Sequence, residues 1–562
     1  MRWQIPTVSP DAVAKLSGEL SVPPLVARLL LLRDVAEPEA AERFLHPSLA
    51  HLHDPYRMAD MARAVERLRR AIESQEKILI YGDYDVDGTM AVVVLLTALR
   101  GLGACVEAHI PHRLTDGYGM RVPVVERAHA GGYRVVLSVD TGIREHAVLE
   151  RARELGLDCI VTDHHLPEDR LPPACAILNP RRGDCGYPEK NLSGVGVAFK
   201  LAQALLGERW SARHVQSYLK IVALGTIADV VPLVGENRVI AHFGLAGLRE
   251  PSQPGLAALL AVAGLEGREV GTGDVAFRLA PRVNAAGRME NARDVIELFT
   301  TSDTARARAI AARLENLNCE RQRVEDEILA AIVGRMGKEP AKSRQSSLVF
   351  AGEGWHRGVI GIVAQRIVDR YYRPTLVIGV ENGEGVGSGR SITGFHLLEA
   401  LNETSDLFER YGGHAQAAGF AIPASRIKEL EARFEAHARA TLTPQELEPA
   451  LRVDGEVNLG ELRLKLYEEV KRLEPYGFGN PTPVFAARDA VLLAPPRVLK
   501  EKHLKLRVGQ GTSSFDALGW GMAGRAAGLS MGDRVDLAFT LDENHYQDST
   551  TLQLIIKDFK ER

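Results

Sequence analysis

The sequence has few cysteines and no long apolar run. Its five cysteines among 562 residues form no C-x-x-C pair, which excludes the usual thiolate site for zinc. No apolar stretch reaches the roughly 18 residues that a membrane-spanning helix requires. The N-terminus, MRWQIPTVSPDAV, lacks the charged and then apolar pattern of a secretory signal. We therefore expect a cytoplasmic protein with reduced thiols and no membrane contact.

Positive charge is not in excess either. The chain has 69 Lys and Arg against 73 Asp and Glu, for a formal net charge of −4. A strongly basic composition is typical of nucleic-acid-binding proteins, so the net charge by itself does not support such a partner. A site rich in metal-binding carboxylates would shift the balance in the negative direction. The positions of the charged residues are therefore more informative than their sum.

Short apolar segments alternate with helical patterns in the first half of the chain. In order, the predicted elements are strand 77–81, helix 91–103, strand 106–110, helix 122–130, strand 134–139, helix 145–156 and strand 158–162. This alternation indicates βαβ units and a parallel sheet. In such sheets, ligands bind at the carboxyl ends of the strands.

The rest of the chain has different patterns. Residues 303–333 contain no glycine or proline, which predicts one long helix. A second α/β unit follows, and from about residue 450 several short strands suggest a small barrel of the OB type. The expected fold class is α/β, with a helical N-terminal cap (1–50), a parallel-sheet catalytic domain (51–300), a long linking helix (301–340), a smaller α/β domain (341–447) and a β-barrel (448–562).

An acidic turn, GDYDVDG (82–88), follows the first predicted strand. Side chains alternate in an extended chain, so Asp83, Asp85 and Asp87 are expected to point the same way. Three carboxylates on one side repel one another unless a cation lies among them. A solvated acidic turn is the alternative, and it is adequate for one such cluster taken by itself.

An EF-hand calcium loop also begins D-x-D-x-D-G, but it requires Glu at its twelfth position. Here that position is Val94, and a strand rather than a helix precedes the motif. The calcium-loop interpretation is therefore rejected.

Two further strands also end in carboxylates. The strand RVVLSV is followed by Asp140, and the strand DCIVT by Asp163, His164 and His165. A single Asp after a strand is usually a helix cap, but three converging strand ends favour a shared site. Asp229, in the apolar segment GTIADVV, is a further candidate, because a buried carboxylate needs a partner or a metal.

Oxygen ligands with one or two imidazoles suit Mn²⁺ or Mg²⁺ better than Zn²⁺. The candidate ligands outnumber the needs of one ion: Asp83, Asp85, Asp87, Asp140, His164 and Asp229, with His165 beside them. Two ions about 4 Å apart are the arrangement for in-line displacement at phosphorus. We therefore expect that a metal-bound water attacks a phosphate while both ions offset the developing charge.

The same residues resemble the DHH phosphoesterase superfamily. Asp83–Gly88 (DYDVDG), Asp140 (VDTGI), the triplet Asp163-His164-His165 and Asp229 match its four motifs in order. The sequence is most similar to the RecJ family of single-stranded-DNA exonucleases, through nearly the whole chain. The matching segments are PHRLTDGYGM (111–120), LSGVGVAFK (192–200), GTIADVVPLVGENR (225–238), LAPRVNAAGRM (279–289), GWHRGVIGIVAQR (354–366), GSGRSITGFHL (387–397), GGHAQAAGF (412–420) and PYGFGNPTPVF (475–485).

This resemblance implies a 5′-to-3′ exonuclease that uses Mn²⁺ or Mg²⁺ to release mononucleotides from single-stranded DNA in recombination and repair. It implies a DHH domain, a long helix, a DHHA1 domain and an OB-fold. It also implies a monomer that works beside a single-stranded-DNA-binding protein and a helicase. One departure concerns Tyr81, where much of the superfamily has a His ligand. Asp83 is our candidate replacement, which leaves the separate roles of Asp83, Asp85 and Asp87 open.

Several residues are candidates for gripping the substrate. Arg113 follows the strand 106–110 and should lie at the same sheet edge, while Tyr118 can stack on a base. In the Gly-rich stretch 387–391, Ser388 and Arg390 can bind a terminal phosphate. Gly-rich stretches alone more often form flexible hairpin turns, but the resemblance favours the phosphate site.

The resemblance assigns further roles. Gly412-Gly413-His414 corresponds to the DHHA1 signature, which implies that the DNA backbone passes close to Gly413 and that His414 faces the scissile phosphate. His356, in GWHRGV, is assigned to substrate binding in the same way. Arg282, Asn284 and Arg288 form a polar cluster that either orients substrate or joins the domains by ion pairs.

In the predicted barrel, polar and apolar residues alternate. Leu504, Leu506 and Val508 are expected to face the core, so that Lys505 and Arg507 form a cationic strip with His503. Such a strip suits an OB-fold surface that follows a DNA backbone. An edge strand guarded by lysine is the alternative.

Two other functions stay open. The first is a DHH enzyme that degrades short oligonucleotides or cyclic dinucleotides; such proteins share the metal motifs but are usually shorter and lack the OB-like part. The second is an inactive single-strand-binding scaffold like those of eukaryotic replication helicases, which lose metal ligands. This chain keeps every acidic position of the four motifs, which favours an active nuclease.

Overall fold

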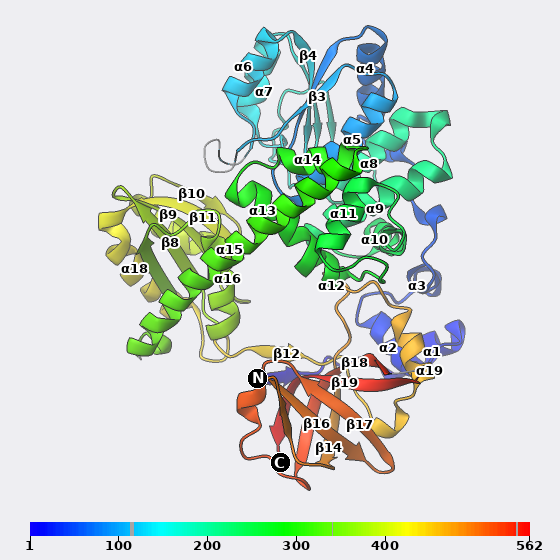
Figure 1. Ribbon diagram of the computed structural model, residues 1–562, viewed down its shortest axis with the longest axis vertical. Helices are drawn as coiled ribbons and strands as arrows, with labels where there is room; N and C mark the ends of the chain where they lie inside the picture. The colour runs from blue at the N-terminus through cyan, green and yellow to red at the C-terminus, as the bar shows by residue number, and fades with distance from the viewer. Residues whose placement is uncertain (113–116, 118, 340, 547–548) are drawn as a thin grey trace. The chain divides into compact units, whose positions relative to one another are not determined.

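The computed structural model describes residues 1–112, 117, 119–339, 341–546 and 549–562 (Figure 1). The chain forms two compact units. We call residues 53–231 and 243–449 the α/β unit, and residues 1–52, 232–242 and 450–562 the barrel unit. Each unit is therefore assembled from segments that are separated in the sequence.

A five-stranded parallel sheet forms the centre of the first half of the α/β unit (Figure 1). Its strands are β2 (Lys77–Tyr81), β3 (Val106–His109), β4 (Tyr133–Val139), β5 (Asp158–Thr162) and β6 (Ala176–Leu178). Their order is β3-β2-β4-β5-β6, and every neighbouring pair is parallel. The order reverses between β2 and β4, and open sheets of this kind bind ligands at that switch point, outside the carboxyl ends of the strands.

Helices cover both faces of this sheet, which is why the inner parts of β2, β4 and β5 are apolar and buried. One face carries α6 (Val122–Ala130) and α7 (His146–Glu154), and the other carries α4 (Met61–Glu73), α5 (Val86–Gly101) and α8 (Gly194–Leu206). The α-helices between residues 212 and 300 are α9 (Ala212–Ala228), α10 (Gly235–Leu248), α11 (Pro254–Val262), α12 (Thr272–Asp274), α13 (Ala280–Met289) and α14 (Arg293–Thr300). Because α9, α13 and α14 pack on α5, that helix is buried all round.

The predicted long helix is present as α15 (Thr304–Lys338), 35 residues long, and Asp303 caps it. A second sheet follows, with strands β7 (Leu348–Glu353), β8 (Thr375–Glu381), β9 (Glu384–Arg390), β10 (Arg410–Gly413) and β11 (Ala417–Pro423) in the order β10-β11-β9-β8-β7. Its helices are α16 (Ile360–Tyr371), α17 (Leu397–Asn402) and α18 (Ile427–Thr441). The Gly-rich stretch after residue 386 lies largely within β9, so it is a strand and not a hairpin turn.

The barrel unit contains a closed ring of strands. Its strands are β13 (Gly455–Glu456), β14 (Phe485–Leu492), β15 (Arg497–Leu499), β16 (His503–Gln510), β17 (Ser513–Gly519), β18 (Arg534–Tyr546) and β19 (Ser549–Glu561). Because β14 pairs with both β18 and β16, the strands β14, β18, β19, β17 and β16 close into a five-stranded barrel. Closure removes the free edges that open sheets expose.

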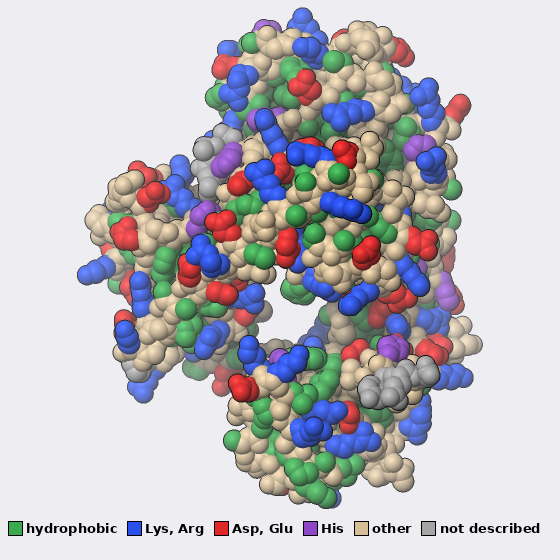
Figure 2. Space-filling view, viewed as in Figure 1, with side chains coloured by type: hydrophobic (Ala, Val, Ile, Leu, Met, Phe, Trp, Pro, Cys, Tyr) green, Lys and Arg blue, Asp and Glu red, His purple; other side chains and the backbone are tan. Residues whose placement is uncertain are grey.

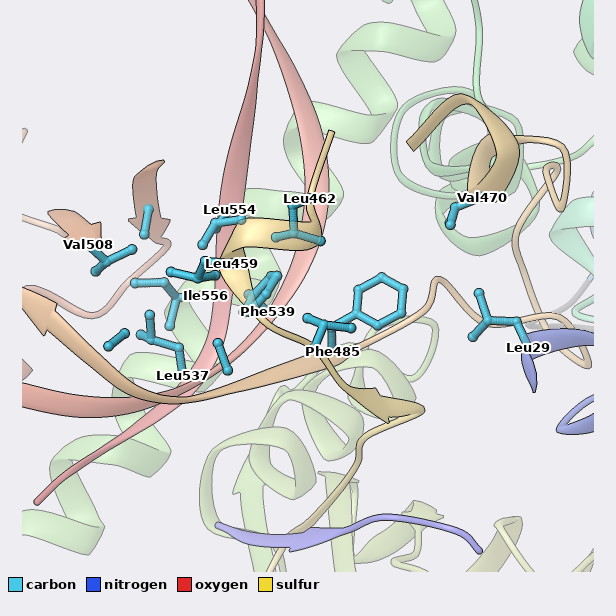
Figure 3. Close-up of a cluster of buried hydrophobic side chains, with 14 of the residues drawn as sticks. Leu29, Leu459, Leu462, Val470, Phe485, Val508, Leu537, Phe539, Leu554 and Ile556 are labelled. Atoms are coloured by element: carbon cyan, nitrogen blue, oxygen red, sulfur yellow. The ribbon is translucent and has the colours of Figure 1, made fainter. Parts of the chain in front are cut away.

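The N-terminal segment shares its core with this barrel. Its elements are β1 (Arg2–Gln4), α1 (Pro10–Leu20), α2 (Pro24–Leu31) and α3 (Pro38–Leu45), and β1 pairs in parallel with β12 (Ala450–Arg452). Figure 3 shows Leu29 of α2 in the same buried cluster as Phe485, Phe539 and Val470, the last from α19 (Leu464–Lys471). The first 52 residues thus fold as part of the barrel unit, and the predicted domain boundaries stay predictions.

The predicted fold class is confirmed: an α/β domain, a long helix, a second α/β domain and a β-barrel follow one another along the chain. Positive and negative side chains are interspersed on the face of the molecule seen in Figure 2, in keeping with the small net charge of −4. Across the described part of the chain, no helix combines the length and apolarity needed to cross a membrane.

Candidate metal centre

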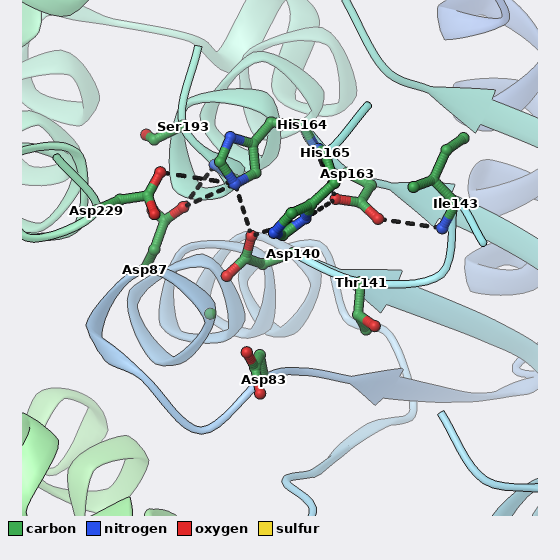
Figure 4. A network of polar contacts seen from close by, with 12 residues as sticks. Asp83, Asp87, Asp140, Thr141, Ile143, Asp163, His164, His165, Ser193 and Asp229 are labelled. Atoms are coloured by element: carbon green, nitrogen blue, oxygen red, sulfur yellow. Dashed lines mark hydrogen bonds and ion pairs between the residues drawn. The ribbon is translucent and has the colours of Figure 1, made fainter. Parts of the chain in front are cut away.

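The candidate metal ligands meet at the carboxyl ends of β2, β4 and β5, next to the switch point of the sheet (Figure 4). Asp83 follows β2, Asp140 follows β4, and His164 follows β5. Asp229 joins them from the C-terminal end of α9. The site forms because all strands of a parallel sheet point the same way, so that residues distant in sequence share one edge.

The acidic turn is helical in its second half, so the extended geometry expected from the sequence is wrong. Helix α5 begins at Val86 because the Asp85 side chain caps it, accepting the N–H of Gly88 at 3.0 Å. Asp87 therefore lies in the first helical turn and meets a different group of ligands from Asp83 and Asp85. Asp83 stays close to its own turn and accepts the N–H of Tyr84 at 2.8 Å.

The N-terminus of α8 holds the Asp87 carboxylate. The N–H groups of Gly194 and Val195 donate to Asp87 Oδ2 and Oδ1 at 2.6 and 3.0 Å. The first turn of a helix favours an anion in this way, because its N–H groups have no partner within the helix. Asp140, which has a φ of +58°, also lies next to Gly194. A Cβ at position 194 would be only 2.6 Å from Asp140 Oδ1. Glycine at 194 therefore lets α8 approach both carboxylates.

The His164 imidazole lies among three of the carboxylates (Figure 4). Its Nε2 is 3.1 Å from Asp140 Oδ1, 3.6 Å from Asp229 Oδ2 and 3.9 Å from Asp87 Oδ2. These four side chains come from four different elements of the fold. Their convergence is therefore a property of the tertiary structure.

Three overlapping groups of potential ligands result: Asp83 with Asp85 and Asp140, Asp87 with His164 and Asp229, and Asp140 with His164 and His165. Among the residues that the structure describes, Asp140 Oδ1, His164 Nε2 and Asp229 Oδ2 are buried and make no hydrogen bond, even though the first two are 3.1 Å apart. A buried polar atom without a hydrogen bond costs free energy. The donor set thus fits divalent cations that prefer oxygen and imidazole.

Electrostatics favours a cation at the same place. Burial, and then the Asp85 carboxylate, raises the pKa of Asp87 to about 7. Burial and the other carboxylates raise the pKa of Asp140 well above its ordinary value, and burial with Asp87 raises the pKa of Asp229 to about 10. Burial lowers the pKa of His164 to about 3, so its imidazole is neutral at neutral pH and available as a ligand. A bound cation would remove the repulsion among these carboxylates.

Asp163 is a positioning residue: it holds the backbone on which the ligands His164 and Asp140 are carried. The sequence alone does not indicate this role. Asp163 Oδ1 accepts the N–H of His164 at 2.7 Å and that of His165 at 3.1 Å, and contacts His165 Nδ1 at 2.7 Å. Its Oδ2 accepts the N–H of Ile143 in the loop after Asp140, at 3.1 Å. Burial alone would raise the pKa of Asp163, but its hydrogen bond with His165 and the charge of that ring hold the pKa below its ordinary value. Asp163 therefore ties the β4 and β5 loops together.

We expect Asp163→Asn to weaken Mn²⁺ binding about 10- to 100-fold, the usual effect of losing a partner that orients metal ligands. An amide of the same shape presents an N–H₂ where one carboxylate oxygen now accepts a hydrogen bond, so one donor loses its acceptor. Isothermal titration of the metal-free protein with Mn²⁺ measures the change. Binding equal to that of the wild type would contradict this role.

Other residues missed by sequence reasoning lie in the loop after β6. Asn179 is fully buried, and its Nδ2 donates to the His165 carbonyl at 2.8 Å. Arg181 is close enough to act electrostatically on His164 and Asp229. The segment ILNPRRG carries no pattern that separates these roles from those of an ordinary loop, so no signal was available.

In the second sheet, the predicted phosphate-binding residues lie near one another. Ser388 and Arg390 lie two residues apart on β9, on one face of the sheet, and Arg390 Nη1 donates to Ser388 Oγ at 3.2 Å. His414 follows β10 and Gly413, and burial followed by the nearby Arg390 charge lowers its pKa. The three side chains thus form one polar cluster.

The predicted polar cluster of Arg282, Asn284 and Arg288 lies on α13, but its members have different surroundings. Arg282 forms an ion pair with Glu315 of α15, as expected if it joins helices. Arg288 donates to the Gly358 carbonyl at 3.1 Å, and the N–H of Gly358 donates to His356 Nδ1 at 3.1 Å. Asn284 is half-buried on the same helix. Arg288 and His356 therefore meet at the junction between α13 and the second α/β domain.

Two predicted residues, Arg113 and Tyr118, lie outside the described residues. In the barrel, Leu504, Leu506 and Val508 are buried, as the alternation predicts. Lys505 and Arg507 both pair with Asp516, at 2.8 and 3.0 Å. The cationic strip is therefore partly neutralised by its neighbouring strand.

Comparison with known proteins agrees with this arrangement. Models of the DHH family N-terminal domain, the DHHA1 domain and the RecJ OB domain match residues 77–226, 344–440 and 453–558. The single-stranded-DNA-specific exonuclease RecJ of Bacillus subtilis is 38% identical, over 99% of this chain and 70% of that protein. RecJ of Escherichia coli is 35% identical, over 97% of each.

Solved structures agree as well. The crystal structure of RecJ in complex with Mn²⁺ from Thermus thermophilus matches with a TM-score of 0.85 and 32% identity, over 100% of this chain and 80% of that chain. The Mg²⁺ complex from the same organism matches with a TM-score of 0.80 and 29% identity, over 100% and 78%. With this agreement in sequence, domain order and fold, the chain belongs to the RecJ family of single-stranded-DNA-specific exonucleases.

Proposed function

We propose that the protein is a metal-dependent exonuclease that digests single-stranded DNA from its 5′ end and releases mononucleotides in recombination and repair. The observation that carries this proposal is the group of buried carboxylate and imidazole atoms at the switch point, among which Asp140 Oδ1, His164 Nε2 and Asp229 Oδ2 make no hydrogen bond. Relatives named as single-stranded-DNA-specific exonucleases, and solved with Mn²⁺ and Mg²⁺, support it.

In this proposal, Mn²⁺ or Mg²⁺ is the cofactor, and two ions bind. Asp83, Asp85 and Asp140 hold one ion, while Asp87, His164 and Asp229 hold the other, with His165 beside them. When bound, such ions make a water molecule acidic enough to attack and offset charge on the phosphate oxygens. The chain itself keeps His164 neutral by burial and fixes Asp87 by two backbone N–H groups, so little reorganisation is needed during the reaction.

The substrate is gripped by residues outside the metal centre. We propose that Ser388, Arg390 and Gly413 bind the terminal phosphate and that His414 faces the scissile one. A guanidinium and a hydroxyl already in contact offer several donors to phosphate oxygens without further ordering. Arg113, Tyr118, Asn284, Arg288 and His356 keep their predicted substrate roles as proposals, whereas the Arg282 ion pair favours a joining role for that residue.

On the barrel, Lys505 and Arg507 are proposed to bind the DNA backbone. Phosphates must compete with Asp516 for these cations, so this contact should weaken steeply as salt rises. We further propose that the protein acts as a monomer in the cytoplasm, beside a single-stranded-DNA-binding protein and a helicase, as the family resemblance implies.

The test uses single-stranded DNA labelled at either its 5′ or its 3′ end, incubated with Mn²⁺, Mg²⁺ or EDTA. Early release of a labelled mononucleotide from the 5′ end, absent with EDTA and with a blunt duplex, is the expected result. Degradation confined to oligomers of a few nucleotides would instead indicate an oligonucleotide phosphodiesterase. Tight binding without cleavage under either metal would leave only a scaffold function.

A further inference from the structure

The segment after the ligand Asp229 belongs to the other unit of the fold. Asp229 is the C-cap of α9 in the α/β unit, and the chain enters the barrel unit at Pro232 and stays there until His242. This segment carries the motif VVPLVGENR, to which the nuclease chemistry assigns no role. A metal ligand therefore lies three residues from the point at which the chain changes units.

Contacts within the barrel unit hold this segment firmly. The Leu233 N–H donates to the Phe478 carbonyl at 2.8 Å, and Asn237 Nδ2 donates to the Pro232 carbonyl at 3.1 Å. Arg238 is almost fully buried, and its guanidinium donates to four backbone carbonyls, those of Phe44, Arg472, Leu473 and Glu474. With the centre of the Phe44 ring 4.0 Å from its guanidinium carbon as well, this buried cation ties together chain segments that are far apart in sequence.

The loop PYGFGNP (475–481) packs on the same segment. We call the segment 232–238 and this loop together the clamp. A Cβ at Gly479, where φ is +74°, would lie 2.9 Å from the Pro232 side chain, and one at Gly477 would lie 2.6 Å from Leu233. Asn480 is fully buried and braces the loop, donating to the Leu473 and Pro475 carbonyls at 2.7 and 2.9 Å. The glycines thus permit the loop to rest directly on Pro232 and Leu233.

Between the clamp and the ligand lies a strained residue. Val230 has a φ of +61° although it is β-branched and 62% exposed. Such a conformation is unfavourable for a β-branched residue and persists only where the surroundings impose it. On its other side, Asp229 is fixed by the helical hydrogen bond from its N–H to the Gly225 carbonyl at 2.9 Å. Val230 therefore lies between two residues, Asp229 and Leu233, whose backbone N–H groups are both hydrogen-bonded.

We infer that Gly479, Arg238 and the strained Val230 position Asp229 for the metal through the chain segment 230–238 that joins them. These are positioning residues, since they act through Asp229 without touching substrate. The inference rests on the proposed metal centre, but it concerns metal binding and not DNA cleavage. A measurement without DNA therefore distinguishes its failure from the failure of the proposed nuclease activity.

The test measures binding of Mn²⁺ alone to EDTA-treated, full-length protein, from the electron paramagnetic resonance signal of free Mn²⁺. Gly479→Ala is expected to raise the dissociation constant about tenfold, as loss of a ligand-orienting contact does. Gly511→Ala is the matched control in the same unit, because φ is +60° there and a Cβ would meet no atom within 4 Å. The control should bind Mn²⁺ like the wild type.

Val230→Gly provides an independent variant, because glycine adopts a positive φ without strain and removes an exposed side chain. It should melt within a few degrees of the wild type yet bind Mn²⁺ more weakly, since Asp229 is no longer held from one side. In the double variant, Gly479→Ala should cause no further loss, as expected for residues acting through one another. The inference is overturned if Gly479→Ala and Gly511→Ala bind Mn²⁺ alike, if Val230→Gly binds like the wild type, or if the two losses simply add.

Discussion

Replacing Asp140 by Asn should lower kcat by about a thousandfold or more while leaving the fold intact. Asp140 belongs to two of the three ligand groups and is the carboxylate nearest to His164 Nε2. Metal charge is worth several kcal/mol to the transition state of phosphoryl displacement, and each 1.4 kcal/mol corresponds to about a factor of ten in rate. An amide of the same shape removes the ligand charge without opening a cavity.

Initial rates on 5′-labelled single-stranded DNA at saturating Mn²⁺ provide the measurement. Asp158→Asn is the matched control, because Asp158 begins β5 at the end of the strand opposite the site and pairs with Arg67 at 2.5 Å. That variant should keep its kcat within a few fold. If Asp140→Asn cuts at a tenth of the wild-type rate or faster, Asp140 is not a ligand that the chemistry requires.

The second large effect concerns stability without metal. In EDTA, the free energy of unfolding should fall as the pH rises from 6.5 to 8.5, and Mn²⁺ should abolish this fall. Burial raises the pKa of Asp229 to about 10 and that of Asp140 well above its ordinary value. The folded protein thus keeps protons that the unfolded chain releases, and stability declines with pH wherever the unfolded state binds fewer protons.

The size of this fall in stability, and the pH range over which it occurs, follow from the same titratable groups. Each carboxyl that stays protonated contributes about 1.4 kcal/mol per pH unit. Asp87, with its pKa raised to about 7, contributes only at the start of the window. His164, with its pKa lowered to about 3, has the opposite effect, but only below pH 6.5, where the unfolded imidazole gains a proton. Above that pH the slope comes from the carboxyls and from His165, whose pKa is raised, against the effect of burial, by its hydrogen bond with Asp163.

Urea unfolding followed by circular dichroism at several pH values, in EDTA and in Mn²⁺, measures this slope. Asp140→Asn should flatten the EDTA curve, because it removes one proton-holding group. Equal slopes with and without metal would mean that these carboxyls do not share a cation. The kinetic experiment thus measures the contribution of Asp140 to catalysis, and the unfolding experiment measures how much its buried carboxyl destabilises the metal-free fold.

The sequence was a good guide wherever one local pattern determined one local structure. The apolar strands 77–81 and 158–162 appear at those residues as β2 and β5, and each carries its acidic residue at its carboxyl end. Parallel strands then bring Asp83, Asp140 and His164 together without further information. The alternation that predicted buried Leu504 and Leu506 also held, because closing a barrel preserves the two-residue period.

The sequence was a poor guide wherever a long-range partner decides. Asp87 was expected in an extended chain, but the Asp85 cap starts the helix earlier and turns Asp87 toward α8. The four contacts of Asp163 depend on how the β4 and β5 loops meet. No sequence pattern near residue 232 predicts that the chain passes from one unit to the other there. The hydrogen-bond partners of this segment lie far away in the sequence, at residues 44 and 472–478.

The pairing of β1 with β12 has a consequence for biosynthesis. Arg2 pairs with Ala450, and Gln4 with Arg452, so the first strand leaves the ribosome long before its partner exists. At ~5–20 residues per second, the interval is roughly 20 to 90 s. During that time, the parallel sheet can form from a contiguous stretch of chain, whereas the N-terminal helices lack the barrel strands that cover Leu29. The newborn protein can therefore form the sheet edge that carries its metal ligands before the barrel unit is complete.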